Sequence, residues 1–212
     1  MKKRSPMKGL ITYSFYAIDK SLISELVLLL VLGILFMVTE NIMFYNFFVM
    51  SALAAAPYIF LSKSGDSSKW DRFQISMPVK RTEVIKALYL AVILLMLPGI
   101  PLIGIIWGLG YVMHESAYSF EFIMPALSAG SVLTWVALLF PLSFTKIGRN
   151  NEQILFIVCM GAAVGIMMGV LFGAIWLDIP NNILPLVMIG IASIIYIISY
   201  VITKGIYAKV DF

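Results

Sequence analysis

The feature that most constrains the fold is a series of six long segments, almost free of charge, along the chain of 212 residues. Each approaches the roughly 20 apolar residues that a helix needs to cross a hydrocarbon core. Because backbone polar groups in lipid must be satisfied internally, helices are the expected structure. We therefore expect an all-α integral membrane protein in which 1–212 form a single transmembrane domain. The six expected spans are about 22–38, 42–61, 87–113, 123–145, 154–177 and 183–203.

The Lys and Arg residues all fall on one side of these spans. Five lie in 1–21, six in 62–86, two in 146–153 and two after residue 203. The connections on the other side, which hold no Lys or Arg, are 39–41, 114–122 and 178–182. Since cytoplasmic loops carry the excess of basic residues, both termini are expected in the cytoplasm.

Residues 1–21 are expected to form an amphipathic helix that leads into the membrane. Ile11, Phe15 and Ile18 follow helical spacing, and Lys and Arg residues precede them. Basic residues beside an apolar helical face favour the headgroup region of the bilayer. We therefore predict an interfacial helix here.

The residue types exclude several classes of function. One His and one Cys, His114 and Cys159, leave no ligand set for zinc and no His-based catalytic triad. No Gly-Lys pair occurs, so the chain lacks a phosphate-binding loop of the Walker type. Glu25 is the only ionisable residue of the acidic, basic or His kind inside the spans, whereas ion-coupled carriers usually need such groups at mid-membrane. We expect no enzyme activity, no cofactor or metal on this chain, and no nucleic-acid partner.

The loop 62–86, between the second and third spans, contains the signals of a short helix. Ser68 and Asp71 have the spacing of a capping box, which satisfies the free N–H groups of a first helical turn. Pro78 would end the helix, because it lacks an N–H and disfavours helical geometry in Met77. A short cytoplasmic helix between these positions is therefore predicted.

This predicted helix has one apolar face. Trp70, Phe73 and Met77 fall at i, i+3 and i+7, while Asp71 and Arg72 belong to the polar remainder. Such a face either docks on another protein or lies on the lipid headgroups. Both interpretations stay open on the sequence alone.

The fifth span carries four glycines at strict spacing of four residues: Gly161, Gly165, Gly169 and Gly173. They form one flat helical face, and such a face lets a second helix approach closely in lipid. We predict a close helix contact there, with a partner that is either internal or a second subunit.

The third and fourth spans contain residues that interrupt or distinguish them. Pro98 and Pro101 predict a bend in the third span, and Pro141 is a candidate for another in the fourth. Tyr89 and Tyr200 fit the inner belt of interfacial aromatic residues.

The middle of the fourth span holds Ser128, Ser131 and Trp135. These residues either pack between helices or line a route for cargo. We retain them as a possible pathway.

Three segments of the chain resemble the small six-span permeases of bacterial ABC-type exporters, and are similar to those of phenol-soluble modulin exporters. The entry segment 7–11, the tail 207–212 and, most specifically, 69–73 with 77–81 provide the resemblance. It implies a permease subunit in the bacterial inner (plasma) membrane that pairs with a second permease copy or paralogue. It also implies a separate ATP-binding cassette ATPase, which would hold ATP and Mg²⁺.

The resemblance implies that 62–86 holds the coupling helix, which seats in the ATPase. The residues expected at that contact are Trp70, Asp71, Arg72, Phe73, Met77 and Pro78. Export of a hydrophobic or amphipathic peptide or a lipid-like molecule is the expected function. The alternative is a membrane scaffold or immunity protein that transports nothing.

Overall fold

The structure is a computed structural model that describes 27–35, 45–46, 49–50, 52, 81–113, 123–145 and 151–208. These residues are helical apart from short turns, and no strand occurs among them. Four helices in this part are long and apolar enough to cross a membrane. The all-helical membrane fold is therefore confirmed for the described residues. The first two expected spans are described only at 27–35 and at a few helical positions between 45 and 52, so the count of six stays a prediction.

Several sequence predictions lie outside the described residues. The entry helix at 1–21 does so entirely, and so does the loop from 62 to 80. The residues expected to contact the ATPase belong to that loop: Trp70, Asp71, Arg72, Phe73, Met77 and Pro78.

The third span consists of two helices, α4 (Arg81–Met96) and α5 (Gly99–Met113). They are separated by a turn at Leu97 and Pro98, in which the Ile100 N–H donates to the Leu97 carbonyl over 3.2 Å. The predicted interruption is confirmed, and its cause is the missing N–H of proline. Helix α4 begins at Arg81, before the expected start of the span at about 87, because charged residues can continue a helix beyond the hydrocarbon core.

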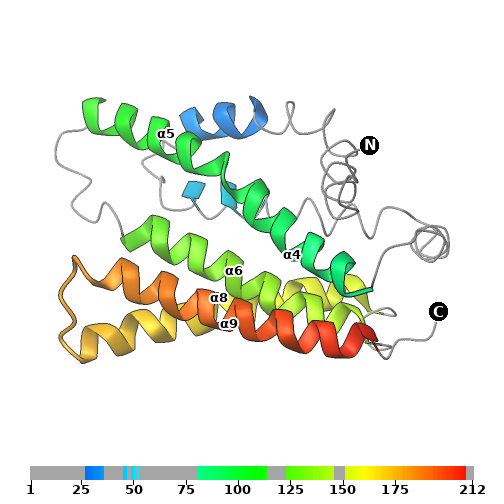
Figure 1. Cartoon of the computed structure of the whole chain (residues 1–212). Coiled ribbons are helices and arrows are strands. Elements are labelled where there is room, and N and C mark those ends of the chain that lie inside the picture. The colour runs from blue at the N-terminus through cyan, green and yellow to red at the C-terminus, as the bar shows by residue number, and fades with distance from the viewer. Residues whose placement is uncertain are drawn as a thin grey trace, which may run out of the picture.

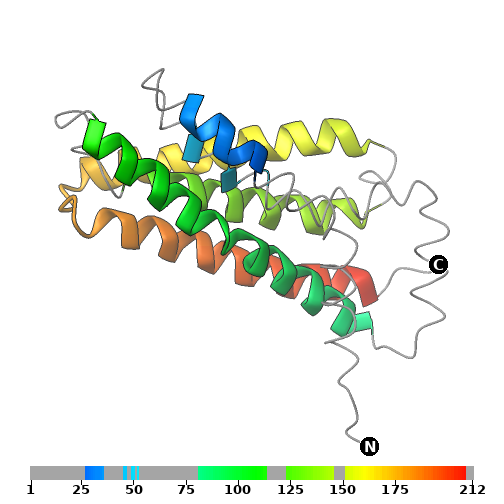
Figure 2. The same cartoon turned by 90° about the horizontal axis from the view of Figure 1, so that it is seen from above.

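The other three long helices are α6 (Ile123–Ser143), α8 (Glu152–Trp176) and α9 (Leu184–Ala208). Seen from above, α6 lies between α8 and α9, and α4 crosses close to α9 (Figure 2). The start of α4 and the end of α9 lie at the same end of the molecule (Figure 1). Lys86 and Lys204 are therefore near one end, and Asp178 near the other.

Helix α8 ends in a Schellman motif at the turn that leads to α9. The N–H of Ile179 donates to the Ala174 carbonyl over 3.0 Å, and that of Asp178 to the Ile175 carbonyl over 3.1 Å. Asp178 has a φ of 52°, in the left-handed region where glycine is usual. Ile179 packs against the small cluster that contains Ala174 and Leu184, which adds the apolar contact typical of this motif.

The main core joins the first half of the chain to the second. The helical residues 27–35 pack against α5 through Gly33, where an added Cβ would lie 2.7 Å from the Tyr45 ring and 2.8 Å from Ile106. The same core continues to Trp135 and Phe140 on α6. Glycine is needed at residue 33 because only its bare Cα permits this approach.

Candidate functional site

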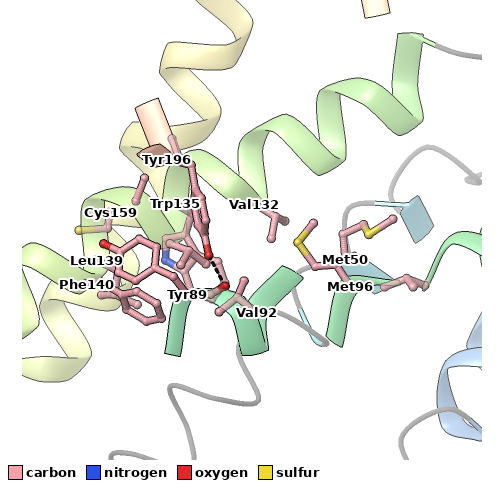
Figure 3. Close-up of a cluster of buried hydrophobic side chains, with 14 of the residues drawn as sticks. Met50, Tyr89, Val92, Met96, Val132, Trp135, Leu139, Phe140, Cys159 and Tyr196 are labelled. Atoms are coloured by element: carbon pink, nitrogen blue, oxygen red, sulfur yellow. Dashed lines mark hydrogen bonds between the residues drawn. The ribbon is translucent and has the colours of Figure 1, made fainter. Parts of the chain in front are cut away.

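A group of hydroxyl side chains joins α4, α6 and α9 inside the span. The Tyr89 hydroxyl on α4 lies 2.7 Å from Ser199 Oγ and 2.7 Å from Thr203 Oγ1, both on α9. Ser199 Oγ donates to the carbonyl oxygen of Ala137 on α6 over 2.6 Å. The Tyr196 hydroxyl donates to the backbone carbonyl of Tyr89 over 2.8 Å (Figure 3). We call Tyr89, Tyr196, Ser199 and Thr203 the tyrosine cluster.

The hydrogens in the tyrosine cluster can be assigned, because each hydroxyl has only one to donate. Ser199 uses its hydrogen on the Ala137 carbonyl, so it accepts from Tyr89. Tyr89 has then spent its hydrogen, so Thr203 is the donor to Tyr89. The result is a directed chain from Thr203 through Tyr89 and Ser199 to the backbone of α6. Successive bonds of this kind polarise one another and strengthen the chain.

The chain of hydrogen bonds ends at the Ala137 carbonyl because residue 141 is a proline. In an uninterrupted helix the N–H four residues later would donate to the Ala137 carbonyl, but proline has no N–H. The Ser199 hydroxyl, which belongs to α9, donates to this carbonyl instead. Helix α6 continues past Pro141 to Ser143, and the bend expected there stays a prediction. Freed carbonyls in membrane helices are commonly satisfied by Ser or Thr in this way.

All four residues of the tyrosine cluster are buried, which strengthens the hydrogen bonds between them. The exposed fraction is 4% for Tyr89, 6% for Tyr196, 4% for Ser199 and 0% for Thr203. The Tyr89 ring also meets the Phe140 and Tyr196 rings edge to face, at centroid distances of 5.1 and 5.0 Å. Each hydrogen bond across helices is worth about 0.6–2 kcal/mol in a membrane. The tyrosine cluster is therefore a firm link between three helices.

Tyr89 does not lie at the predicted membrane interface. It was expected in the interfacial aromatic belt, but its side chain is buried among helices. Tyr200, expected in the same belt, is half-buried, with its ring 5.5 Å from that of Tyr89. A usable signal was present: Tyr196, Ser199 and Thr203 lie at i, i+3 and i+7, which puts three polar groups on one helical face.

The possible pathway residues lie on α6, the central helix. Ser128, Ser131 and Trp135 are all buried, with exposed fractions of 3%, 2% and 2%. The Ser128 hydroxyl donates to the Pro125 carbonyl over 2.8 Å. The Trp135 ring meets Phe156 of α8 edge to face at 4.7 Å. The structure thus brings these residues to the inside of the helix bundle, and their role in a pathway stays a prediction.

Two polar atoms beside this group have no hydrogen-bond partner among the described residues. They are Oγ1 of Thr134, which is 0% exposed, and Nε1 of Trp135. A buried donor without a partner costs about 1–3 kcal/mol.

The four glycines of α8 face away from α6. Their neighbours on the opposite face, Cys159, Ala163, Met167 and Ala174, are the buried residues of this helix. A Cβ added at any of the glycines would meet no described atom within 4 Å. The described helices therefore do not supply the predicted close contact, and its partner stays a prediction.

No group of three or more His, Cys, Asp or Glu residues that could hold a metal ion occurs in the described part of the chain. The tyrosine cluster binds helices together, and the partnerless atoms on α6 lie in an otherwise apolar interior. This arrangement can hold helices together.

These features define a multi-pass α-helical membrane protein. The sequence profile of the family described as ABC-2 family transporter protein matches 9–208. The chain therefore belongs to the ABC-2 transporter family, and is a permease, the transport subunit, rather than a catalytic one. The family implies an ATPase partner and a membrane setting. Comparison with curated proteins and with solved structures found no match.

Proposed function

We propose that the chain is the membrane subunit of an ATP-driven exporter that moves a hydrophobic or amphipathic peptide, or a lipid-like molecule, outward. The family match over 9–208 is the observation that supports this most directly. The energy would come from a separate ATPase subunit that holds ATP and Mg²⁺. The nearly uncharged spans agree with this proposal, because they lack the ionisable groups that coupling to an ion gradient usually needs.

The orientation follows from the same proposal. Both termini and the loop 62–86 would face the cytoplasm of a bacterial cell, with the chain in its plasma membrane. The distribution of Lys and Arg along the sequence supports this orientation. It would put the start of α4 on the side where an ATPase works.

The second copy or paralogue would pack against the glycine face of α8. This face is open toward all described residues, and it presents a flat backbone surface. In lipid, helices associate mainly by close packing, and small residues at four-residue spacing permit it.

Cargo would pass beside Ser128, Ser131 and Trp135 when the helices around α6 separate. The partnerless Thr134 and Trp135 atoms support this proposal. Opening toward water or a peptide backbone would relieve their cost.

The test of the proposed function is the contact with the ATPase. In this proposal the Trp70, Phe73 and Met77 face seats in the ATPase, with Asp71 and Pro78 setting the helix ends. Interface energy concentrates in desolvated aromatic anchors, whereas charges at the rim mainly tune the encounter. Trp70→Ala with Phe73→Ala should therefore weaken binding by about 2–4 kcal/mol, roughly 30- to 1000-fold in affinity.

The measurement is co-purification of the ATPase with the tagged chain from native membranes, followed by ATP hydrolysis of the complex. Lys69→Ala and Arg72→Ala are matched controls from the polar side of the same segment, and each should cost less. Retention of the ATPase by the double variant at the unsubstituted level would contradict the proposed contact. Failure of the unsubstituted chain to retain any ATPase would favour a scaffold or immunity protein.

A further inference from the structure

The tyrosine cluster lies close to the point where α4 leaves the cytoplasmic loop. Tyr89 is eight residues after Arg81, the first residue of α4. At 1.5 Å per residue this is about 12 Å along the helix. A displacement at the start of α4 would therefore reach the tyrosine cluster early. Among the described residues, this cluster holds the hydrogen bonds that link α4 to α9 and, through Ser199, to α6.

Two features set α4 apart from α5, the other helix of the third span. The far end of α4 is the turn at Leu97 and Pro98, beyond which α5 packs with the helical residues 27–35 around Gly33. Its near half is held by the Tyr89 side chain and also by its own backbone, through the Tyr196 hydroxyl on the Tyr89 carbonyl. Helix α4 is thus attached to α9 at its middle, and its helical hydrogen bonding is interrupted at Leu97 and Pro98.

The directed hydrogen-bond chain extends this attachment to α6. Thr203 and Ser199 both belong to α9, and the last bond of the chain is on the Ala137 carbonyl of α6. That carbonyl is free to accept only because of Pro141. The three helices are therefore linked at one level of the bundle.

We propose that the tyrosine cluster transmits movement of the cytoplasmic loop to the transport helices, so that α4, α6 and α9 move as one body while the third span bends at Leu97 and Pro98. This inference rests on the proposed function, since the loop must be moved by an ATPase. Tyr89 is a positioning residue: it acts through the helices that it holds.

The test follows helix movement and needs no knowledge of the cargo. Cysteine pairs in a Cys159→Ala background would carry spin labels at exposed positions, one label always at Gln153 on α8. A second label at Lys86 reports α4, and one at Lys204 reports α9. Distances would be measured in the complex purified with its native ATPase, with and without MgATP and vanadate.

In the unsubstituted complex both distances should shift with nucleotide. In Tyr89→Phe with Tyr196→Phe, which keeps both rings and removes both hydroxyls that join α4 to α9, the Lys86 shift should remain and the Lys204 shift should be lost. Ser199→Ala with Thr203→Val and Tyr196→Phe removes the same bonds from the α9 side and should give the same loss. Tyr200→Phe is the matched control, because its ring packs against Tyr89 at 5.5 Å while its hydroxyl is outside the chain.

The outcomes separate the two proposals. A Lys204 shift that persists in both variants would refute transmission through the tyrosine cluster and leave the proposed function in place. The absence of any shift in the unsubstituted complex would refute the proposed function, and this inference with it. Loss of the Lys204 shift in Tyr200→Phe as well would contradict the inference, because this variant leaves the hydrogen-bond chain and the packed ring in place.

Discussion

Helices α6 and α8 are both long and apolar, yet they lie in opposite surroundings. In the most apolar window of α6, 67% is buried inside the molecule, against 17% for α8. The glycine at residue 130 of α6 meets α8 and α9, with an added Cβ 3.1 Å from Met167 Sδ and 3.7 Å from the Ala192 side chain. The glycine at residue 165 of α8 meets no described atom within 4 Å.

The difference shows what decides burial in a membrane. Lipid accepts large apolar side chains, so hydrophobicity alone does not draw a helix inward. The polar and small residues of α6 need protein around them, because lipid offers polar groups no partner. The exposed side of α8 instead presents large apolar residues such as Ile157, Phe172 and Ile175. A helix with fewer large apolar groups thus becomes the centre.

The largest expected effect is that of replacing Trp135 on α6, and Trp176 on α8 serves as the comparison. Trp135→Ala should destabilise the fold by about 3–5 kcal/mol, since it leaves a cavity where the ring packs against Phe156. Trp176→Ala should change stability little, because Trp176 is 84% exposed. The measurement is reversible unfolding in mixed micelles. Equal effects of the two substitutions would mean that α6 is not the core of the bundle.

A smaller effect is expected from glycine substitutions, and it should differ in kind. Gly130→Leu should lower stability by about 1–3 kcal/mol, since the added side chain meets Met167 and the α9 backbone. Gly165→Leu and Gly169→Leu should leave the stability of the single chain unchanged. They should instead disrupt assembly with a second copy, because larger side chains hold the helix backbones apart.

Gly173→Ala is the mild control for the α8 variants. Chain stability would be measured by unfolding, and assembly by cross-linking in the native membrane. Normal assembly of both leucine variants would mean that the glycine face touches only lipid. A fall in single-chain stability with Gly165→Leu would instead place an internal partner on that face.

Local features of this comparison could be predicted from sequence. Pro98 stops a helix whatever lies around it, so the break between α4 and α5 was foreseen. Helices α6, α8 and α9 were placed because span length is set by the bilayer. The four-residue spacing of the glycines revealed a flat face on α8, but not what it contacts.

Features that depend on pairing between distant helices could not be predicted. The effect of Pro141 depends on Ser199, which lies 62 residues away from the carbonyl it satisfies. Tyr89 was assigned to the membrane interface from its distance to the end of the span. Its burial follows from the position of α9, which periodicity within α4 does not reveal.

The smallest expected effect concerns the turn that fixes the end of α8. Asp178 holds a left-handed conformation there, with a φ of 52°. Asp178→Gly should change stability by less than about 0.5 kcal/mol, because relief of the strain is offset by the greater freedom of glycine in the unfolded chain. Asp178→Val should cost about 1–2 kcal/mol, since a β-branched residue is poorly accommodated at that φ.

The turn also separates the two helices of the comparison. The Schellman bonds of Asp178 and Ile179 end on carbonyls of α8, so Asp178→Val should loosen the last turn of that helix and leave α6 protected. Amide hydrogen exchange in micelles would measure this, with faster exchange expected for 174–179 and unchanged exchange in the middle of α6. Equal exchange in the valine and glycine variants would mean that the left-handed residue does not hold the end of α8. Faster exchange along α6 in the valine variant would mean instead that the weakly buried α8 supports the centre of the bundle.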